Sequence, residues 1–214
     1  MMIPKTDREY RDMMLRIVED EEEKKVTGYA TTFNQRYLLW QDDEVRIFEE
    51  VSPDAFAETD LSDVIMQYNH EGRVFARVSN GTLTVTPDEH GLLIDADLGG
   101  TTLGRQLYEE IRGGYTDKMS FGFTVTGEEQ LRDDVEGEPI TVTRRITRIG
   151  KLYDVSAVSL PANPNTEITA RTKEYCDGVI AALAEECRRK EAEDHKAQQR
   201  AQLAQLLQEV KNHD

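Results

Sequence analysis

The chain has 214 residues, of which 38% are hydrophobic and 32% are charged. This length accommodates one domain of about 100 to 150 residues with a surplus, and it excludes a large multidomain machine. The net charge is −16, and residues 26–170 carry most of the excess, with 12 basic and 25 acidic side chains. A surface that follows nucleic-acid phosphates needs clustered Lys and Arg, so nucleic acid is disfavoured as a partner. A basic protein segment is an electrostatically easier partner.

Membrane insertion and secretion are also disfavoured. No apolar run approaches the ~20 residues that a membrane span needs, and the first 15 residues lack the apolar core of a signal peptide. We therefore expect a soluble protein that stays in the compartment where it is made. The two cysteines, Cys176 and Cys187, lie eleven residues apart in an expected helix, about 16 Å along its axis. This is too far for a disulfide, and reduced thiols in a cytosol are the expectation.

Three segments follow one another along the chain. Residues 1–25 end in the charge run Glu19–Lys25, which is typical of a solvated arm or helix end and receives no chemical role here. In residues 26–170, turn residues separate short β-rich runs, which predict strands at Val26–Phe33, Val45–Val51, Asp63–Tyr68, Val74–Val78, Leu83–Thr86, Leu92–Leu98, Ser120–Thr126, Thr141–Thr147 and Val155–Leu160.

Turn chemistry predicts how these strands connect. Ser79–Gly81 and Pro87–Gly91 predict two consecutive hairpins. Closely spaced strands joined by such turns are typical of a barrel or sandwich. We expect an α+β, mainly β domain.

Helical periodicity appears in three places. Thr102–Arg112 has an apolar residue every fourth position, a threonine cap and a glycine pair at its end. Ser52-Pro53-Asp54 predicts the start of a second, shorter helix. Residues 171–214 form a predicted helical tail whose two apolar patches flank a charged stretch. Such a tail is expected to dock on its own domain, on a second copy of the chain or on another protein.

Few residues suit catalysis. Glycine-rich phosphate loops and clustered metal ligands are absent from the sequence, and we expect no cofactor. Of four histidines, only His70 closes an apolar-alternating run, where a strand end can present it at a cleft. Ser120 opens a predicted strand next to Gly122, whose uncovered backbone suits close approach of a substrate. Taken alone, a structural histidine and a hydrogen-bonded strand serine are the commoner interpretations.

Several runs together resemble a known family. They are Tyr68–Glu71, Met119–Phe123 and Leu152–Pro164, preceded by Gly28–Phe33 and Glu49–Phe56. In order and spacing they are similar to the signatures of the prohead (capsid maturation) serine proteases of tailed phages, over roughly residues 26–170. The resemblance implies a closed or partly open antiparallel β-barrel flanked by helices, similar to herpesvirus assemblins. It also implies an endopeptidase that trims scaffold and capsid-protein extensions.

The same resemblance implies catalytic roles. Ser120 is the nucleophile, His70 the general base and Asp154 the third member, at a place where the family more often has Glu. Assemblins use a second histidine in that third role instead. The chain order His, Ser, Asp differs from the orders of trypsin-like, subtilisin-like and α/β-hydrolase enzymes. For the oxyanion hole the backbone of residues 156–159 and the arginines Arg144, Arg145 and Arg148 stay open as alternatives.

The sequence thus predicts a serine endopeptidase that processes the major capsid protein and its scaffold region inside the immature prohead, in the host cytoplasm. The tail is predicted to target or restrain the enzyme and to be removed by autocleavage. Two alternatives stay open. One is a non-enzymatic capsid assembly or scaffolding protein whose tail oligomerises, and the other is a protease fused to a scaffold remnant.

Overall fold

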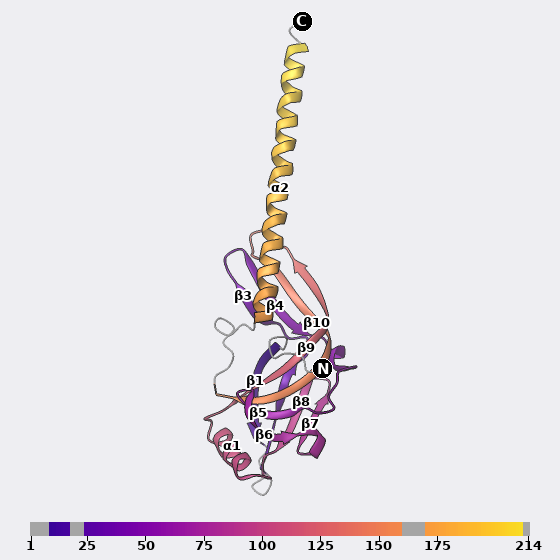
Figure 1. Ribbon diagram of the computed structural model, residues 1–214. Coiled ribbons are helices and arrows are strands. Elements are labelled where there is room, and N and C mark those ends of the chain that lie inside the picture. The colour runs from indigo at the N-terminus through magenta and orange to yellow at the C-terminus, as the bar shows by residue number, and fades with distance from the viewer. Residues whose placement is uncertain (1–8, 18–23, 160–169, 212–214) are drawn as a thin grey trace. The chain divides into compact units, whose positions relative to one another are not determined.

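The computed structural model describes residues 9–17, 24–159 and 170–211 (Figure 1). It is an α+β protein dominated by strands, as expected. Its α-helices are α1 (Thr102–Arg112) and α2 (Ala170–Lys211). The strands are β1 (Glu9–Ile17), β2 (Lys25–Thr32), β3 (Tyr37–Gln41), β4 (Val45–Val51), β5 (Ile65–Tyr68), β6 (Glu71–Arg77), β7 (Leu83–Pro87), β8 (Gly91–Asp97), β9 (Lys118–Asp133) and β10 (Ile140–Val158).

All described strands belong to one sheet. Its order is β3-β4-β10-β9-β1-β2-β8-β7, and the β5–β6 hairpin joins it through β5, which pairs with β10. The antiparallel expectation is wrong in part, because β4 and β5 both run parallel to β10. Among the described strands the path has two ends, β3 and β7, and forms no closed barrel. The barrel expectation is therefore not confirmed.

Two long strands form the centre of the sheet. β9 has 16 residues and β10 has 19, and they pair antiparallel along most of their length. The sequence analysis predicted two separate strands, Thr141–Thr147 and Val155–Leu160, where β10 is continuous to Val158. Register shifts between Ile146 and Asp154 let β10 keep its pairing with β9 through the stretch between the two predicted strands. Leu160 lies outside the described residues.

Two strands were not predicted. β1 lies in the segment expected to be a charged arm, yet its residues pair with β9 on one side and β2 on the other. β3 pairs antiparallel with β4 at the edge of the sheet. The local sequence of β1, Glu-Tyr-Arg-Asp-Met-Met-Leu-Arg-Ile, mixes charged and apolar residues, so its strand state depends on its partners rather than on its own composition.

The remaining connections agree in part with expectation. Pro53–Phe56 forms the predicted short helix as a 3₁₀ turn, and β7 and β8 form the predicted hairpin. The other predicted hairpin is wrong: Ser79–Gly81 leads from β6 to β7, but β6 pairs with β5 and β7 pairs with β8. The true partner of β6 follows from a different turn, at residues 69 and 70.

The core lies under one face of α1. Thr101 caps this helix by accepting a hydrogen bond from Gly104 N at 2.9 Å. Leu107, Tyr108 and Ile111 join a buried cluster with apolar residues of β2, β5, β8, β9 and β10, whereas Leu103 is exposed. Close packing of the apolar side chains of β9 in this core restricts the movement of the strand and of the other residues that it carries.

The C-terminal segment is helical, as predicted. α2 runs without interruption over 42 residues, and the chain divides by its contacts into Met1–Lys173 and Glu174–Asp214. Cys176 and Cys187 both lie in α2, and neither forms a disulfide in the described part of the chain. Within the described ranges, no helix is both long and apolar enough to cross a membrane.

Candidate active site

His70 lies in a two-residue turn between β5 and β6. Tyr68 pairs with Glu71 across this turn, and Asn69 and His70 have φ angles of 50° and 57°. Positive φ at both central residues is the conformation of a type I′ hairpin turn, which Asn tolerates well and for which glycine is preferred at the second position. Histidine at such a position costs conformational energy, and strain of this kind is concentrated at functional sites.

The turn is attached to the end of β10. Asn69 N donates to Ala157 O at 2.9 Å, and Ser159 N donates to the Asn69 side-chain Oδ1 at 3.1 Å. The backbone and the side chain of Asn69 thus both bind the strand that carries Asp154. This attachment fixes the position of His70 relative to β10.

The structure brings two of the three predicted residues into contact. His70 Nδ1 lies 2.5 Å from Asp154 Oδ1, and the side chains are 19% and 3% exposed. A carboxylate can only accept, so this bond assigns the proton of a neutral His70 ring to Nδ1 and makes Nε2 the basic nitrogen. That is the arrangement a general base requires.

Ser156 is a member of the cluster that the sequence analysis did not single out. Its Oγ donates to Asp154 Oδ1 at 2.9 Å, and the residue is fully buried. Residues two apart on a strand share a face, so the spacing of Ser156 from Asp154 was the signal that could have identified it. One oxygen of Asp154 therefore binds both His70 and Ser156.

Ser120 lies on the neighbouring strand. It pairs directly with Ser156 in the β9–β10 register, and directly opposed residues have Cβ atoms about 5 Å apart. The side chain is buried, and in the part of the chain that the structure describes its Oγ has no hydrogen-bond partner. The bond from Ser120 to His70 is accordingly not formed here. A buried hydroxyl without a partner costs about 1 to 3 kcal/mol, so this orphan calls for an explanation.

Two of the candidate oxyanion-hole donors are bound elsewhere. Arg144 pairs with Glu49 and Glu128, and Arg145 pairs with Glu50. These arginines precede Asp154 by ten and nine residues on the same strand. That distance is about 30 Å for an extended chain, so neither arginine suits this site. Ser159 N, among the backbone candidates, donates to Asn69.

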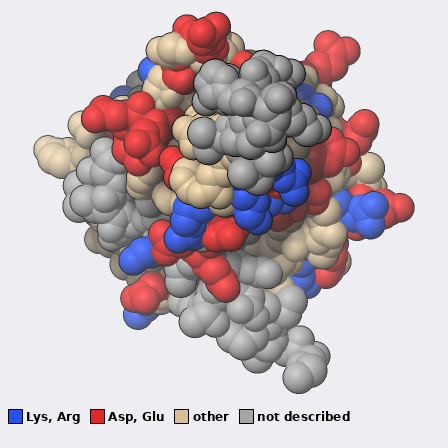
Figure 2. All heavy atoms as spheres, turned by 90° about the horizontal axis from the view of Figure 1, so that it is seen from above, with Lys and Arg blue, Asp and Glu red and all other residues tan. Residues whose placement is uncertain are grey.

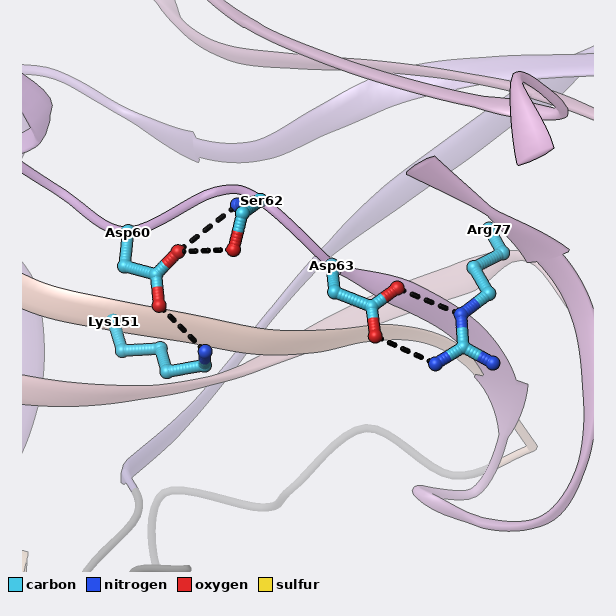
Figure 3. A network of polar contacts seen from close by, with 5 residues as sticks. All are labelled: Asp60, Ser62, Asp63, Arg77 and Lys151. Carbon is cyan, nitrogen blue, oxygen red and sulfur yellow. Dashed lines mark hydrogen bonds and ion pairs between the residues drawn. The ribbon is translucent and has the colours of Figure 1, made fainter. Parts of the chain in front are cut away.

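A second polar network lies on the exposed side of the same region (Figure 3). Lys151 Nζ lies 2.6 Å from Asp60 Oδ2, and Ser62 Oγ donates to Asp60 Oδ1 at 2.6 Å. Arg77 forms two bonds to Asp63, at 2.6 and 2.7 Å. These bonds hold the pKa of Asp60 well below its ordinary value and lower the pKa of Asp63 to about 2. The network ties the segment before β5 to β10 and β6.

The surface charge agrees with the composition. Figure 2 shows acidic side chains spread widely over the face that it draws, with basic side chains scattered among them. No group of three or more His, Cys, Asp and Glu residues with metal-binding geometry was found among the described residues. The charge distribution favours attraction of basic rather than acidic segments.

Comparison with known proteins identifies a family. The family model of the caudovirus prohead serine proteases matches residues 11–178, which include the β5–β6 turn and both central strands. No curated protein and no solved structure matches the chain significantly.

Proposed function

Because this chain belongs to the caudovirus prohead serine protease family, we propose that Ser120, His70 and Asp154 are its nucleophile, general base and orienting acid. The observation that carries the proposal is the partly buried bond between His70 and Asp154, together with a buried Ser120 hydroxyl that has no hydrogen-bond partner in the described structure. The strained turn at His70 supports it further. These roles account for three features that cost stability: the strained turn at His70, the buried Asp154 carboxylate and the Ser120 hydroxyl that has no partner in the described structure.

The chemistry is acyl transfer to a serine. His70 Nε2 takes the proton of Ser120 as Oγ attacks the peptide carbonyl, and the Asp154 carboxylate stabilises the imidazolium that forms. The proton then passes to the leaving amine, and water repeats the sequence to release the acyl group. Catalytic hydrogen bonds often tighten only when a substrate is bound, so the bond from Ser120 to His70 is expected to form in the substrate complex.

We assign the capsid protein and its scaffold region as substrates, within the prohead. The family description supports this assignment, and the acidic surface suits basic segments of the substrate. Removal of the α2 tail by the enzyme itself is a further part of the proposal, because the helix is a separate contact unit after Lys173.

Replacement of the nucleophile tests the proposal. Co-expression of the chain with the capsid precursor should yield shortened capsid protein, measured by intact mass, and Ser120→Ala should abolish this product. Thr143→Ala is a matched control, because Thr143 Oγ1 is also buried without a hydrogen-bond partner among the described residues, and it should leave processing intact. Unchanged processing by Ser120→Ala would refute the protease assignment. If processing is unchanged and prohead assembly still depends on the chain, the result would favour a non-enzymatic assembly protein.

A further inference from the structure

Ser156 occupies a place in the cluster that the triad does not require. Its hydroxyl donates to the same Asp154 oxygen that binds His70, and it lies opposite Ser120 in the strand register. It is fully buried, so water cannot replace its bond to Asp154. The hydroxyl therefore connects the Asp154 carboxylate to β10 at the position that pairs with Ser120 on β9.

A donated bond of this kind restricts the carboxylate. With two donors converging on Oδ1, the plane of Asp154 is fixed by β10 itself as well as by His70. Without Ser156, the buried carboxylate can rotate about its side-chain torsion, and the imidazole loses the acceptor that selects its tautomer. Outer-shell hydrogen-bond partners fix the tautomer and orientation of metal-bound histidines in a comparable way.

We infer that Ser156 is a positioning residue that holds the Asp154 carboxylate so that His70 carries its proton on Nδ1. The inference rests on the proposed function, because it assigns Ser156 a task within the same site. Ser156 does not contact the scissile bond in this role. Its loss should lower kcat with KM nearly unchanged, since substrate binding is not involved.

A pair of isosteric variants separates the hydroxyl from the packing. Ser156→Thr keeps the donor and Ser156→Val replaces it with a methyl group of the same shape, so any crowding is equal in the two. We expect kcat of Ser156→Val to fall about 10- to 100-fold below that of Ser156→Thr, which corresponds to the loss of one hydrogen bond to a charged group. Equal kcat values within twofold would overturn the inference.

The chain provides a matched control for serine removal. Ser62 also donates to an aspartate oxygen, at 2.6 Å, but on the exposed network of Figure 3. Ser62→Ala should leave kcat unchanged, whereas Ser156→Ala should lower it about as much as Ser156→Val does. If the Thr and Val variants fail to fold, this alanine pair decides, and an equal effect of both alanines would contradict the inference.

A spectroscopic measurement distinguishes failure of the inference from failure of the proposed function. In 15N-histidine-labelled Ser120→Ala protein, with His70 assigned by His70→Gln, the His70 ring should show the Nδ1–H tautomer. Adding Ser156→Val should shift it toward a tautomer mixture, and adding Ser62→Ala should not. An unchanged tautomer overturns the role of Ser156 whatever the activity, while proteolysis that survives Ser120→Ala refutes only the proposed function.

Discussion

Two polar clusters that each include a residue of β10 use similar contacts for different ends. In each, a serine hydroxyl donates to an aspartate Oδ1, from Ser156 to Asp154 at 2.9 Å and from Ser62 to Asp60 at 2.6 Å. The Asp154 side chain is 3% exposed and the Asp60 side chain 44%. Water screens the second cluster and can replace any of its bonds, but it has little access to the Asp154 carboxylate of the first. Burial, rather than the list of contacts, distinguishes the two.

Strain and an unmet hydrogen bond accompany only the buried cluster. His70 has a positive φ angle and Ser120 Oγ has no partner in the described structure. The exposed network has side-chain bonds of 2.6 to 2.7 Å, and its aspartates are stabilised in the charged form. A cluster that costs stability indicates function more strongly than one that contributes to it.

The largest difference between the clusters should follow from changing the two aspartates to asparagine. Asp154→Asn presents an amide that can stabilise the wrong histidine tautomer, and we expect kcat to fall about 10⁴-fold. Asp60→Asn should leave kcat within about twofold, because solvent screens the exposed Asp60 charge from the catalytic residues. Steady-state kinetics on a capsid-derived peptide measures both. Similar losses in the two variants would show that burial is not the deciding difference.

A buried ion pair distant from the site tests whether the effect of burial on stability is independent of the effect on kcat. Arg144→Met removes the cation that binds Glu49, which is fully buried, and we expect the free energy of unfolding to fall by about 3 to 5 kcal/mol. Arg77→Met, on the exposed network, should change it far less. Urea denaturation measures these differences, and at temperatures where Arg144→Met stays folded its kcat should be near wild type. A large kcat loss in a folded Arg144→Met protein would contradict this separation.

The strained turn should show an intermediate effect. Asn69→Ala loses the bond from Ser159 N and the tolerance of Asn for positive φ, which we expect to cost about 1 to 2 kcal/mol of unfolding free energy. Asn69→Gly keeps the conformational freedom and loses only the side-chain bond, so its cost should be smaller. Thermal denaturation ranks the two. Equal destabilisation would mean that the φ angle carries no strain.

The smallest effect concerns acid. Arg77 lowers the pKa of Asp63 to about 2 from an ordinary 3.8, so the pair stabilises the folded state above about pH 4 and loses this contribution as the pH falls toward 2. Unfolding of the wild type and of Arg77→Met should therefore differ slightly at neutral pH and converge over that range. Added salt should shrink the neutral-pH difference. A difference that grows on acidification would reverse the assigned sign.

The sequence predicted local features better than partnerships. α1 and β4 were predicted with their observed bounds, because a capped 3.6-residue period and a short β-rich run between turns are local signals. β1 was missed, since its strand state depends on β9 and β2. The contact of His70 with Asp154 agrees with the motif-based prediction, whereas the bond from Ser156 depends on side-chain geometry that no motif indicated. The catalytic roles themselves stay a prediction.

The pairing of β1 has a consequence for the order of synthesis. Asp12 is the register partner of Ser120, which in turn pairs with Ser156. These three positions are separated by more than 100 and more than 30 residues along the chain. β2 follows β1 closely and can pair with it early, but a ribosome must deliver β9 before β1 gains its second partner, and contacts of such high sequence separation form slowly. Proteolytic activity of a newly synthesised chain should therefore appear only some time after its translation is complete.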